Sequence, residues 1–124
     1  MAGEPILIVE DNPINAMLVE VLLTTREYET KTAANAEEAL IILTTFPAKL
    51  IIMDIQLPGI DGLELTRQLK ADPQYKNIII VAVTAYAMKG DREKALAAGC
   101  DEYIPKPIDI NSFADVITEM LQEK

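Results

Sequence analysis

Short, wholly apolar segments alternate with segments whose apolar residues recur at helical spacing, and this alternation runs through the 124-residue chain. The runs at residues 6–9, 50–53 and 78–83 contain no polar side chain, which is typical of strands buried on both faces of a parallel sheet. Residues 29–33 and 102–104 read as two less apolar strands, and a helical pattern follows each strand. We therefore predict an α/β fold: one five-stranded parallel sheet, doubly wound, in a single domain over residues 1–124.

Two helix starts are clear in the sequence. Asn12 precedes Pro13, and Asn35 precedes a pair of glutamates, so each asparagine is a candidate N-cap. A third signal, Gly99, follows the helix expected at residues 91–98 and suits a left-handed C-cap. The helix after Pro13 carries an apolar stripe made of Ile14, Met17, Leu18, Val21 and Leu22. We expect this stripe to face the core in part, and periodicity alone leaves open which of its residues remain outside.

The composition excludes several classes of protein. Lys and Arg number 11 against 20 Asp and Glu, and the net charge of −9 argues against binding nucleic acid or anionic membranes. No apolar run approaches the ~20 residues that span a bilayer, and no signal peptide is evident. The absence of His excludes His-based triads and zinc sites. With one cysteine, Cys100, we expect no internal disulfide, a partly buried apolar role for that thiol, and a cytoplasmic location.

Charged and hydroxyl side chains follow the expected strands where each one ends. Glu10 and Asp11 follow the first strand, Asp54 the third, Thr84 the fourth and Lys106 the fifth. Ligand sites of open α/β sheets lie beyond the carboxyl ends of the strands, so these side chains should meet. Any one acid could equally be a helix cap or a solvated loop end, but all five positions together favour a site. Three neighbouring carboxylates repel one another, and Mg²⁺ would relieve that repulsion.

A carboxylate beside Mg²⁺, Lys and Thr is suited to accept a phosphoryl group. The carboxylate attacks phosphorus and becomes an aspartyl phosphate. The metal ion and the lysine neutralise charge on the transferring oxygens, where most of the stabilisation of phosphoryl transfer arises. The threonine hydroxyl can donate a hydrogen bond to the bound group.

Four segments in this order carry a family resemblance: residues 6–12 (ILIVEDN), 53–62 (MDIQLPGIDG), 83–85 (VTA) and 103–107 (YIPKP). They closely resemble the receiver domain of two-component response regulators, and the resemblance covers roughly residues 5–121. It implies the flavodoxin-like (βα)5 receiver fold. By the same resemblance Asp54 is the phosphoacceptor, Asp11 contacts Mg²⁺ directly, Glu10 contacts it through water, and the backbone carbonyl of Gln56 completes the protein ligands.

The resemblance also implies a switch. Thr84 matches the switch hydroxyl, Tyr103 the switch aromatic, and Lys106 the phosphoryl-binding lysine. The family pattern leads us to expect a cis Lys106–Pro107 peptide bond, whereas most X–Pro bonds are trans. The phosphoryl group should then change the face made by the fourth helix, fifth strand and fifth helix.

The partners implied by the resemblance are proteins. A histidine kinase or histidine phosphotransfer protein would donate the phosphoryl group, docking at the first helix, and a downstream protein target would read the switched face. We do not expect this chain to be an enzyme that turns over a free substrate. A receiver of this family catalyses only its own phosphorylation and dephosphorylation. We expect no output domain within residues 1–124, and whether the chain is complete or a receiver excised from a hybrid histidine kinase or larger regulator stays open.

Three alternatives were weighed. An aspartate-nucleophile phosphatase of the haloacid dehalogenase type carries a second acid two residues after the nucleophile, where this chain has Gln56. A flavin carrier of flavodoxin type needs a phosphate-binding loop after the first strand, where Glu10 and Asp11 would repel phosphate. A degenerate receiver that works without phosphorylation is the third alternative, although all five site positions hold competent residue types.

Overall fold

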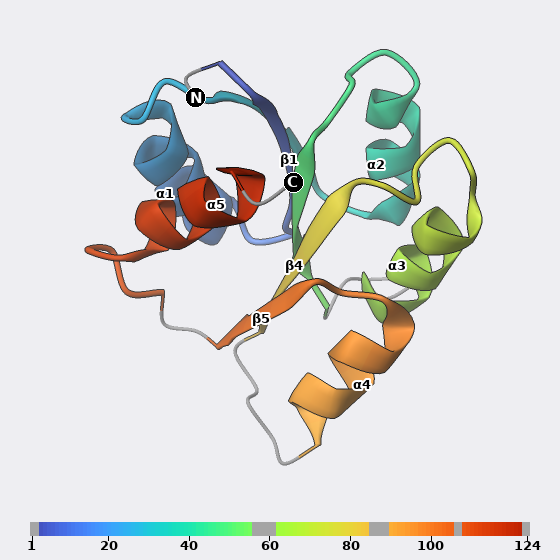
Figure 1. The fold of residues 1–124 in the computed structure, drawn as a ribbon. Coiled ribbons are helices and arrows are strands. Elements are labelled where there is room, and N and C mark those ends of the chain that lie inside the picture. The colour runs from blue at the N-terminus through green and yellow to red at the C-terminus, as the bar shows by residue number, and fades with distance from the viewer. Residues whose placement is uncertain (1–2, 56–61, 85–89, 106–107, 123–124) are drawn as a thin grey trace.

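A computed structural model describes residues 3–55, 62–84, 90–105 and 108–122, with the backbone alone for Thr84 and Asp91. Five parallel strands form one sheet in the order β2-β1-β3-β4-β5. The strands are β1 (Pro5–Val9), β2 (Glu29–Ala33), β3 (Leu50–Asp54), β4 (Ile79–Thr84) and β5 (Glu102–Pro105). The helices are α1 (Pro13–Thr24), α2 (Ala36–Leu43), α3 (Gly62–Ala71), α4 (Asp91–Ala98) and α5 (Phe113–Gln122). The predicted doubly wound α/β architecture is confirmed (Figure 1).

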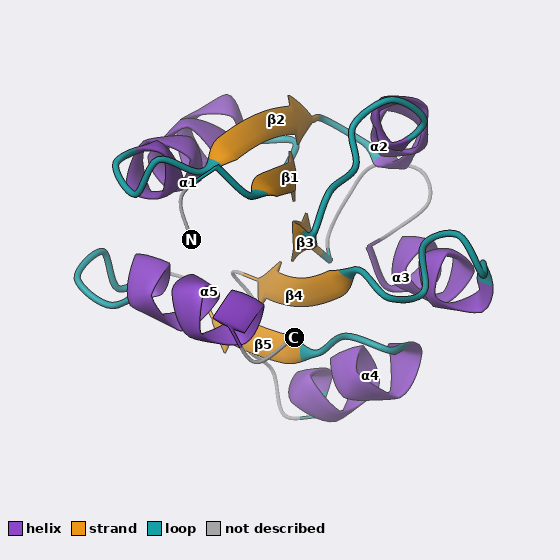
Figure 2. Ribbon diagram, turned by 45° about the horizontal axis from the view of Figure 1, so that its top comes forward, coloured by secondary structure: helices purple, strands orange, loops and turns teal. Residues whose placement is uncertain are grey.

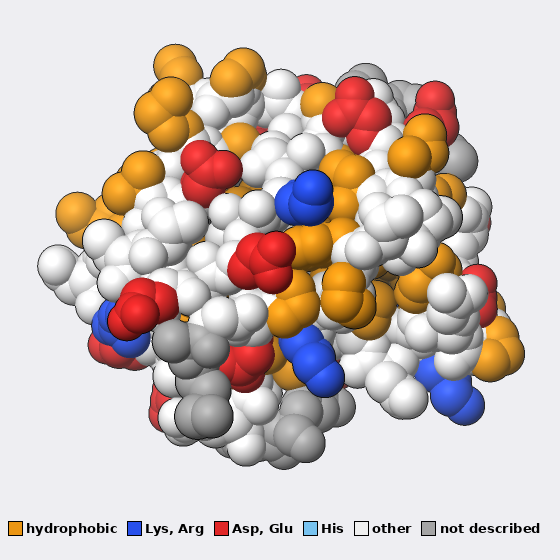
Figure 3. Space-filling view, turned by 90° about the horizontal axis from the view of Figure 1, so that it is seen from above, with side chains coloured by type: hydrophobic (Ala, Val, Ile, Leu, Met, Phe, Trp, Pro, Cys, Tyr) orange, Lys and Arg blue, Asp and Glu red, His pale blue; other side chains and the backbone are white. Residues whose placement is uncertain are grey.

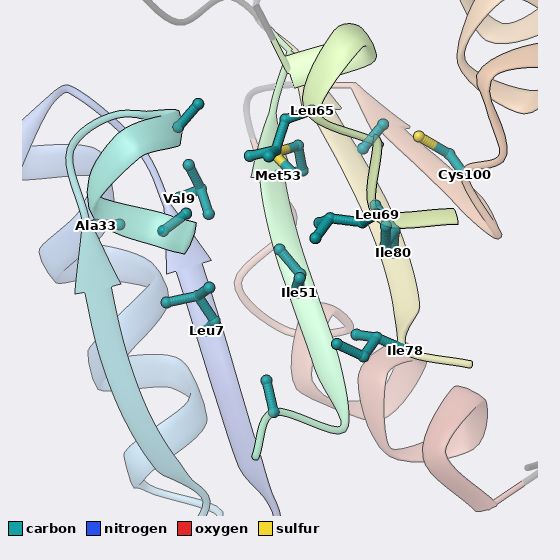
Figure 4. Close-up of a cluster of buried hydrophobic side chains, with 14 of the residues drawn as sticks. Leu7, Val9, Ala33, Ile51, Met53, Leu65, Leu69, Ile78, Ile80 and Cys100 are labelled. Atoms are coloured by element: carbon teal, nitrogen blue, oxygen red, sulfur yellow. The ribbon is translucent and has the colours of Figure 1, made fainter. Parts of the chain in front are cut away.

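The sheet lies between two layers of helices. Figure 2 shows α1 and α5 on one face and α2, α3 and α4 on the other. Because successive side chains of a strand point to opposite faces, each strand feeds two cores. In β1, Ile6 and Ile8 join the core under α1 and α5, while Leu7 and Val9 join the core under the other three helices (Figure 4). Burial on both faces explains why the central strands are apolar throughout.

Helix α1 turns a different side to the core than the apolar stripe suggested. Its buried residues are Ala16, Val19 and Leu23. Most of the stripe is exposed, and Leu22 alone among its residues is half-buried: Ile14, Met17, Leu18 and Val21 all face solvent. The stripe therefore faces the core only through Leu22, and these four residues are the ones that remain outside. The helix is apolar on two sides, and the small Ala16 side chain lies on the side that packs against the sheet.

The predicted caps are present. The Asn12 carboxamide oxygen accepts hydrogen bonds from the backbone N–H groups of Ile14 (2.9 Å) and Asn15 (3.2 Å). The Asn35 oxygen accepts one from Glu38 N–H at 2.9 Å. Gly99 ends α4 with φ of +113°, a left-handed conformation that favours glycine. These caps fix where α1 and α2 begin, directly after the ends of β1 and β2.

Polar contacts fasten helices to distant strands. The Tyr28 and Thr118 hydroxyls are hydrogen-bonded at 2.6 Å, which joins the start of β2 to α5. On the other face, Lys70 of α3 donates to the Ile78 carbonyl (2.8 Å) and to Asp101 (3.0 Å).

None of the helices among the described residues combines the length and apolar character needed to cross a bilayer.

We expect Ile80→Ala to lower the free energy of unfolding by about 2–5 kcal/mol, because it removes a fully buried side chain from the central strand β4. Urea denaturation measures the change. The matched control is Ile41→Ala, which removes the same atoms from a side chain that is 69 % exposed on α2, and should shift stability by less than about 0.5 kcal/mol. Equal losses in the two variants would contradict the assignment of the core.

Candidate functional site

Three carboxylates meet at the carboxyl edge of the sheet. Glu10 follows β1, Asp54 ends the neighbouring strand β3, and Asp11 comes one residue after Glu10. One carboxylate oxygen from each lies within 4.8 Å of the other two. Glu10 and Asp54 are only 7 % and 6 % exposed, whereas Asp11 faces solvent. The sequence prediction that these three acids converge is thus borne out in their geometry.

Backbone hydrogen bonds hold Glu10 in place. Its N–H donates to the Ala33 carbonyl at 2.9 Å, which continues the β1–β2 pairing by one residue. One of its carboxylate oxygens accepts from the N–H of Asn12 at 3.2 Å. Asn12 in turn caps α1, so the acid and the helix start form one turn. The turn that begins α1 therefore also aims Glu10 at Asp54.

Gly62 allows α3 to begin against the backbone that carries Asp54. A Cβ atom on this glycine would lie 2.5 Å from the Asp54 carbonyl oxygen and 2.6 Å from the Ile55 Cα. Its N–H donates to the Ile55 carbonyl at 3.2 Å, and its own carbonyl accepts from the buried Thr66 hydroxyl at 2.8 Å. Sequence reasoning assigned no role to Gly62. The available signal was a glycine at the expected start of a helix, directly after a functional strand end.

The electrostatics of the cluster favour a small, hard cation. Two of the three carboxylates are buried, and negative charges this close repel one another, which a cation between them would relieve. The donor set is oxygen only, which suits Mg²⁺. Asp11 is exposed, so water has access to the remaining coordination positions. The residues present therefore fit a magnesium ion.

A cavity of about 390 Å³ adjoins the two buried acids. Its walls come from α1, from the strands β1, β3 and β4, and from a residue between β5 and α5: Ile8, Val9, Asn15, Leu18, Val19, Ile52, Val83 and Ile108. Glu10 and Asp54 complete the lining. Leu18 of α1 and Ile108 thus line the same cavity as the two buried acids.

Of the remaining predicted site residues, Thr84 is described by its backbone alone and Tyr103 in full. Thr84 ends β4, opposite Pro105 of β5, so its backbone lies at the same edge as Asp54; its side chain is outside the described residues. Tyr103 is buried in the core under α2, α3 and α4. Gln56, Lys106 and the Lys106–Pro107 bond lie outside the described residues.

Cys100 has the structural character that the sequence suggested. The side chain is buried, and its S–H donates to the Thr66 hydroxyl oxygen at 3.8 Å. Burial raises the pKa of the Cys100 thiol above its ordinary value, which keeps it protonated at neutral pH. A buried, protonated thiol is a poor nucleophile, so the chemistry of the site falls to the carboxylates.

The family model described as "Response regulator receiver domain" matches residues 6–118. The chain belongs to this family. It is 44 % identical over 116 residues to the polar-differentiation response regulator DivK of Brucella anthropi, a match that covers 94 % of each chain. It is therefore a receiver domain, the signalling module of two-component systems.

Two solved structures of similar receiver domains are described with a bound magnesium ion or with a phosphotransfer protein. The receiver domain of the Pseudomonas aeruginosa sensor histidine kinase PA1611, described with a magnesium ion coordinated in its active site cleft, is 34 % identical with a TM-score of 0.83, covering 98 % of this chain and 97 % of that one. A Saccharomyces cerevisiae co-crystal structure of the histidine phosphotransfer protein Ypd1 and the Ssk1 receiver domain matches at 34 % identity and a TM-score of 0.85, covering 95 % and 88 %.

We expect Gly62→Ala to lower the free energy of unfolding by about 1–3 kcal/mol, because the added methyl group overlaps the backbone of Asp54 and Ile55. Helix propensity alone favours alanine over glycine by about 1 kcal/mol, so a loss of stability reports the steric clash. Urea denaturation measures it, with Gln68→Ala on the exposed side of the same helix as the control. A stabilised Gly62→Ala variant would refute the close approach.

Proposed function

We propose that this receiver accepts a phosphoryl group from a phosphohistidine of another protein onto Asp54. The observation that carries the proposal is the buried Asp54 carboxylate with a second buried acid, Glu10, and the exposed Asp11 beside it at one sheet edge. In the reaction an Asp54 oxygen attacks phosphorus, the P–N bond to the histidine breaks, and the electron pair of that bond returns to the imidazole. The product is an aspartyl phosphate.

Asp11, Asp54 and the Gln56 carbonyl would hold Mg²⁺, with Glu10 acting through a water molecule. The ion would supply positive charge to the oxygens of the transferring phosphoryl group. The Lys106 ammonium would add a second positive charge there, as the family resemblance implies. The oxygen-only donor set at the end of β1 and β3 supports this assignment.

The family switch is part of the same proposal. The Thr84 hydroxyl would donate to the bound phosphoryl group, and Tyr103 would follow the movement of the β4–α4 connection. Tyr103 lies beside Ala82 in the β4–β5 register and is already buried, so the two switch positions are on adjacent strands. The exposed side of α4, β5 and α5 would then present a changed surface to a downstream protein target.

We infer that residues 1–124 act as one receiver unit that modifies only itself and turns over no free substrate. The match of the receiver family to residues 6–118 supports this view. A phosphohistidine donor is charged from ATP, and we infer that donor and receiver meet in the cytoplasm. The net charge of −9 supports protein partners over nucleic acid or anionic membranes.

A histidine kinase or histidine phosphotransfer protein is the proposed donor, and α1 is its proposed docking helix. Ile14, Met17 and Leu18 are exposed on α1 beside the cavity that leads to Asp54. Exposed apolar patches of this kind mark interaction surfaces in soluble proteins. The yeast complex between Ypd1 and the Ssk1 receiver domain supports a phosphotransfer partner.

Intact-mass spectrometry after incubation with acetyl phosphate and Mg²⁺ tests the acceptor. We expect the wild type to gain one phosphoryl group, and Asp54→Asn and a chelator-treated sample to gain none. The matched control is Asp72→Asn, which makes the same chemical change at the end of α3 and should gain the group like the wild type. Phosphorylation of Asp54→Asn, or no gain by the wild type even with phosphohistidine donors, would contradict the proposal.

The docking helix has its own test. We expect Ile14→Lys to slow phosphoryl transfer at least about tenfold from a histidine phosphotransfer domain that phosphorylates the wild type, because it places a charge in an apolar contact. Reaction with acetyl phosphate should stay unchanged. Ile41→Lys is the matched control, since Ile41 is 69 % exposed on α2 and Ile14 is 77 % exposed. Equal effects of both variants on transfer would remove α1 as the docking site.

A further inference from the structure

The edge of the sheet opposite Asp54 holds a larger cavity, of about 800 Å³. It lies at the amino ends of β1, β3 and β4, between the α2–β3 connection (residues 44–49) and the α3–β4 connection (residues 72–78). Figure 3 looks on to this end of the molecule and shows hydrophobic side chains gathered near the middle of the face, with Lys or Arg side chains beside them. None of the described residues that line this cavity also lines the cavity beside Glu10 and Asp54.

The inner surface of this cavity is largely apolar and includes two aromatic rings. Phe46 is buried, Tyr75 is half-buried, and Leu43 and Ile78 lie between the two connections. Small-molecule sites typically measure about 300–1,000 Å³ and combine apolar and aromatic walls with a few polar groups. The volume and the lining therefore suit the apolar body of a small ligand.

The charge at this cavity has the opposite sign to the charge of the molecule. Among the described residues that line it, Lys49 alone is charged, in a chain whose net charge is −9. Hydrogen bonds on both sides hold the Lys49 backbone: its N–H donates to the Pro5 carbonyl (2.8 Å), and its carbonyl accepts from Ile79 N–H (3.2 Å). A second cation is close, since the Lys31 ammonium lies 5.9 Å from the centre of the Phe46 ring. An anionic group bound here would meet the Lys49 cation, which lines the cavity.

The carboxyl end of α2 also points toward this edge, and its carbonyl groups would oppose an anion. Two of those carbonyls accept hydrogen bonds from the turn that follows α2. Thr44 N–H donates to the Ile41 carbonyl, and Thr45 and Phe46 N–H groups both donate to the Ile42 carbonyl. The Thr44 hydroxyl adds a further bond to the Ile41 carbonyl at 2.6 Å. This turn reduces the negative partial charge that α2 presents to the cavity.

We propose that this cavity binds a small amphipathic anion. Its aryl or acyl body packs between Phe46 and Tyr75, and its carboxylate pairs with Lys49. The site is separate from Asp54 and goes beyond the phosphoryl transfer proposed above. Its occupant touches the segments that lead into β1, β3 and β4, so binding braces the amino ends of the strands whose other ends carry the acids.

Three probes of one shape and different charge test the proposal: 4-phenylbutyrate, 4-phenylbutan-1-ol and 4-phenylbutylamine. Each is titrated into the isotope-labelled chain and followed by amide chemical shifts. We expect the anion to bind at least threefold more tightly than the alcohol and the amine to bind most weakly, with shifts concentrated at residues 43–49 and 74–78. Tyr75→Ala should weaken binding of all three probes, because it removes part of the apolar wall.

Charge reversal gives the decisive comparison. Lys49→Glu keeps both backbone hydrogen bonds of residue 49 and should invert the order, so that the amine binds more tightly than the anion. Lys94→Glu is the matched control, because it changes the net charge equally on the exposed side of α4 and should leave the order unchanged.

Three results would overturn the proposal: equal binding of the three probes, an unchanged order in Lys49→Glu, or shifts that map to the cavity beside Asp54. Asp54→Asn separates this site from the proposed phosphorylation, because binding of 4-phenylbutyrate should be the same in that variant and in the wild type. Failure of phosphorylation would thus leave this result intact, and failure of binding would leave the phosphorylation result intact.

Discussion

The parallel register of the three central strands decides where every described acid of the site lies. Val9 pairs with Met53, and Asp54 pairs with Val83, so β1, β3 and β4 end within a residue of one another at the same edge. A slip of one residue would turn Asp54 to the other face of the sheet. It would also exchange the side chains of the two cores, and because both cores are packed with apolar residues, the register is strongly specified.

Keeping Glu10 and Asp54 buried beside each other opposes folding, since both carboxylates lose water and repel one another. The Asn12 N–H, which donates to the Glu10 carboxylate, offsets part of this cost. Gly62 lets α3 close against the same segment without a side chain in the way. The result is a concentration of negative charge on a rigid edge, a preorganised arrangement for a divalent cation.

Much of this arrangement could be predicted from the sequence, because it depends on local patterns. The apolar strands, the Asn12 and Asn35 caps and the grouping of Glu10, Asp11 and Asp54 all follow from residue order and from the rule for strand ends. The core side of α1 could not be predicted, since that helix is apolar on two sides and only packing chooses between them. Nor could Gly62, whose role is a contact across the fold, or the amino-edge cavity, which two connections far apart in sequence enclose.

The exposed stripe of α1 also affects how readily the protein associates with itself. Each molecule has an exposed apolar face formed by Ile14, Met17 and Val21. Each molecule also carries a net charge of −9, and the resulting repulsion between molecules opposes association of two such faces at low ionic strength. Salt shortens the reach of that repulsion to about 8 Å at physiological ionic strength, and acidification removes the carboxylate charge itself. The excess of acidic over basic residues that argues against nucleic acid as a partner thus also opposes self-association through α1 at neutral pH.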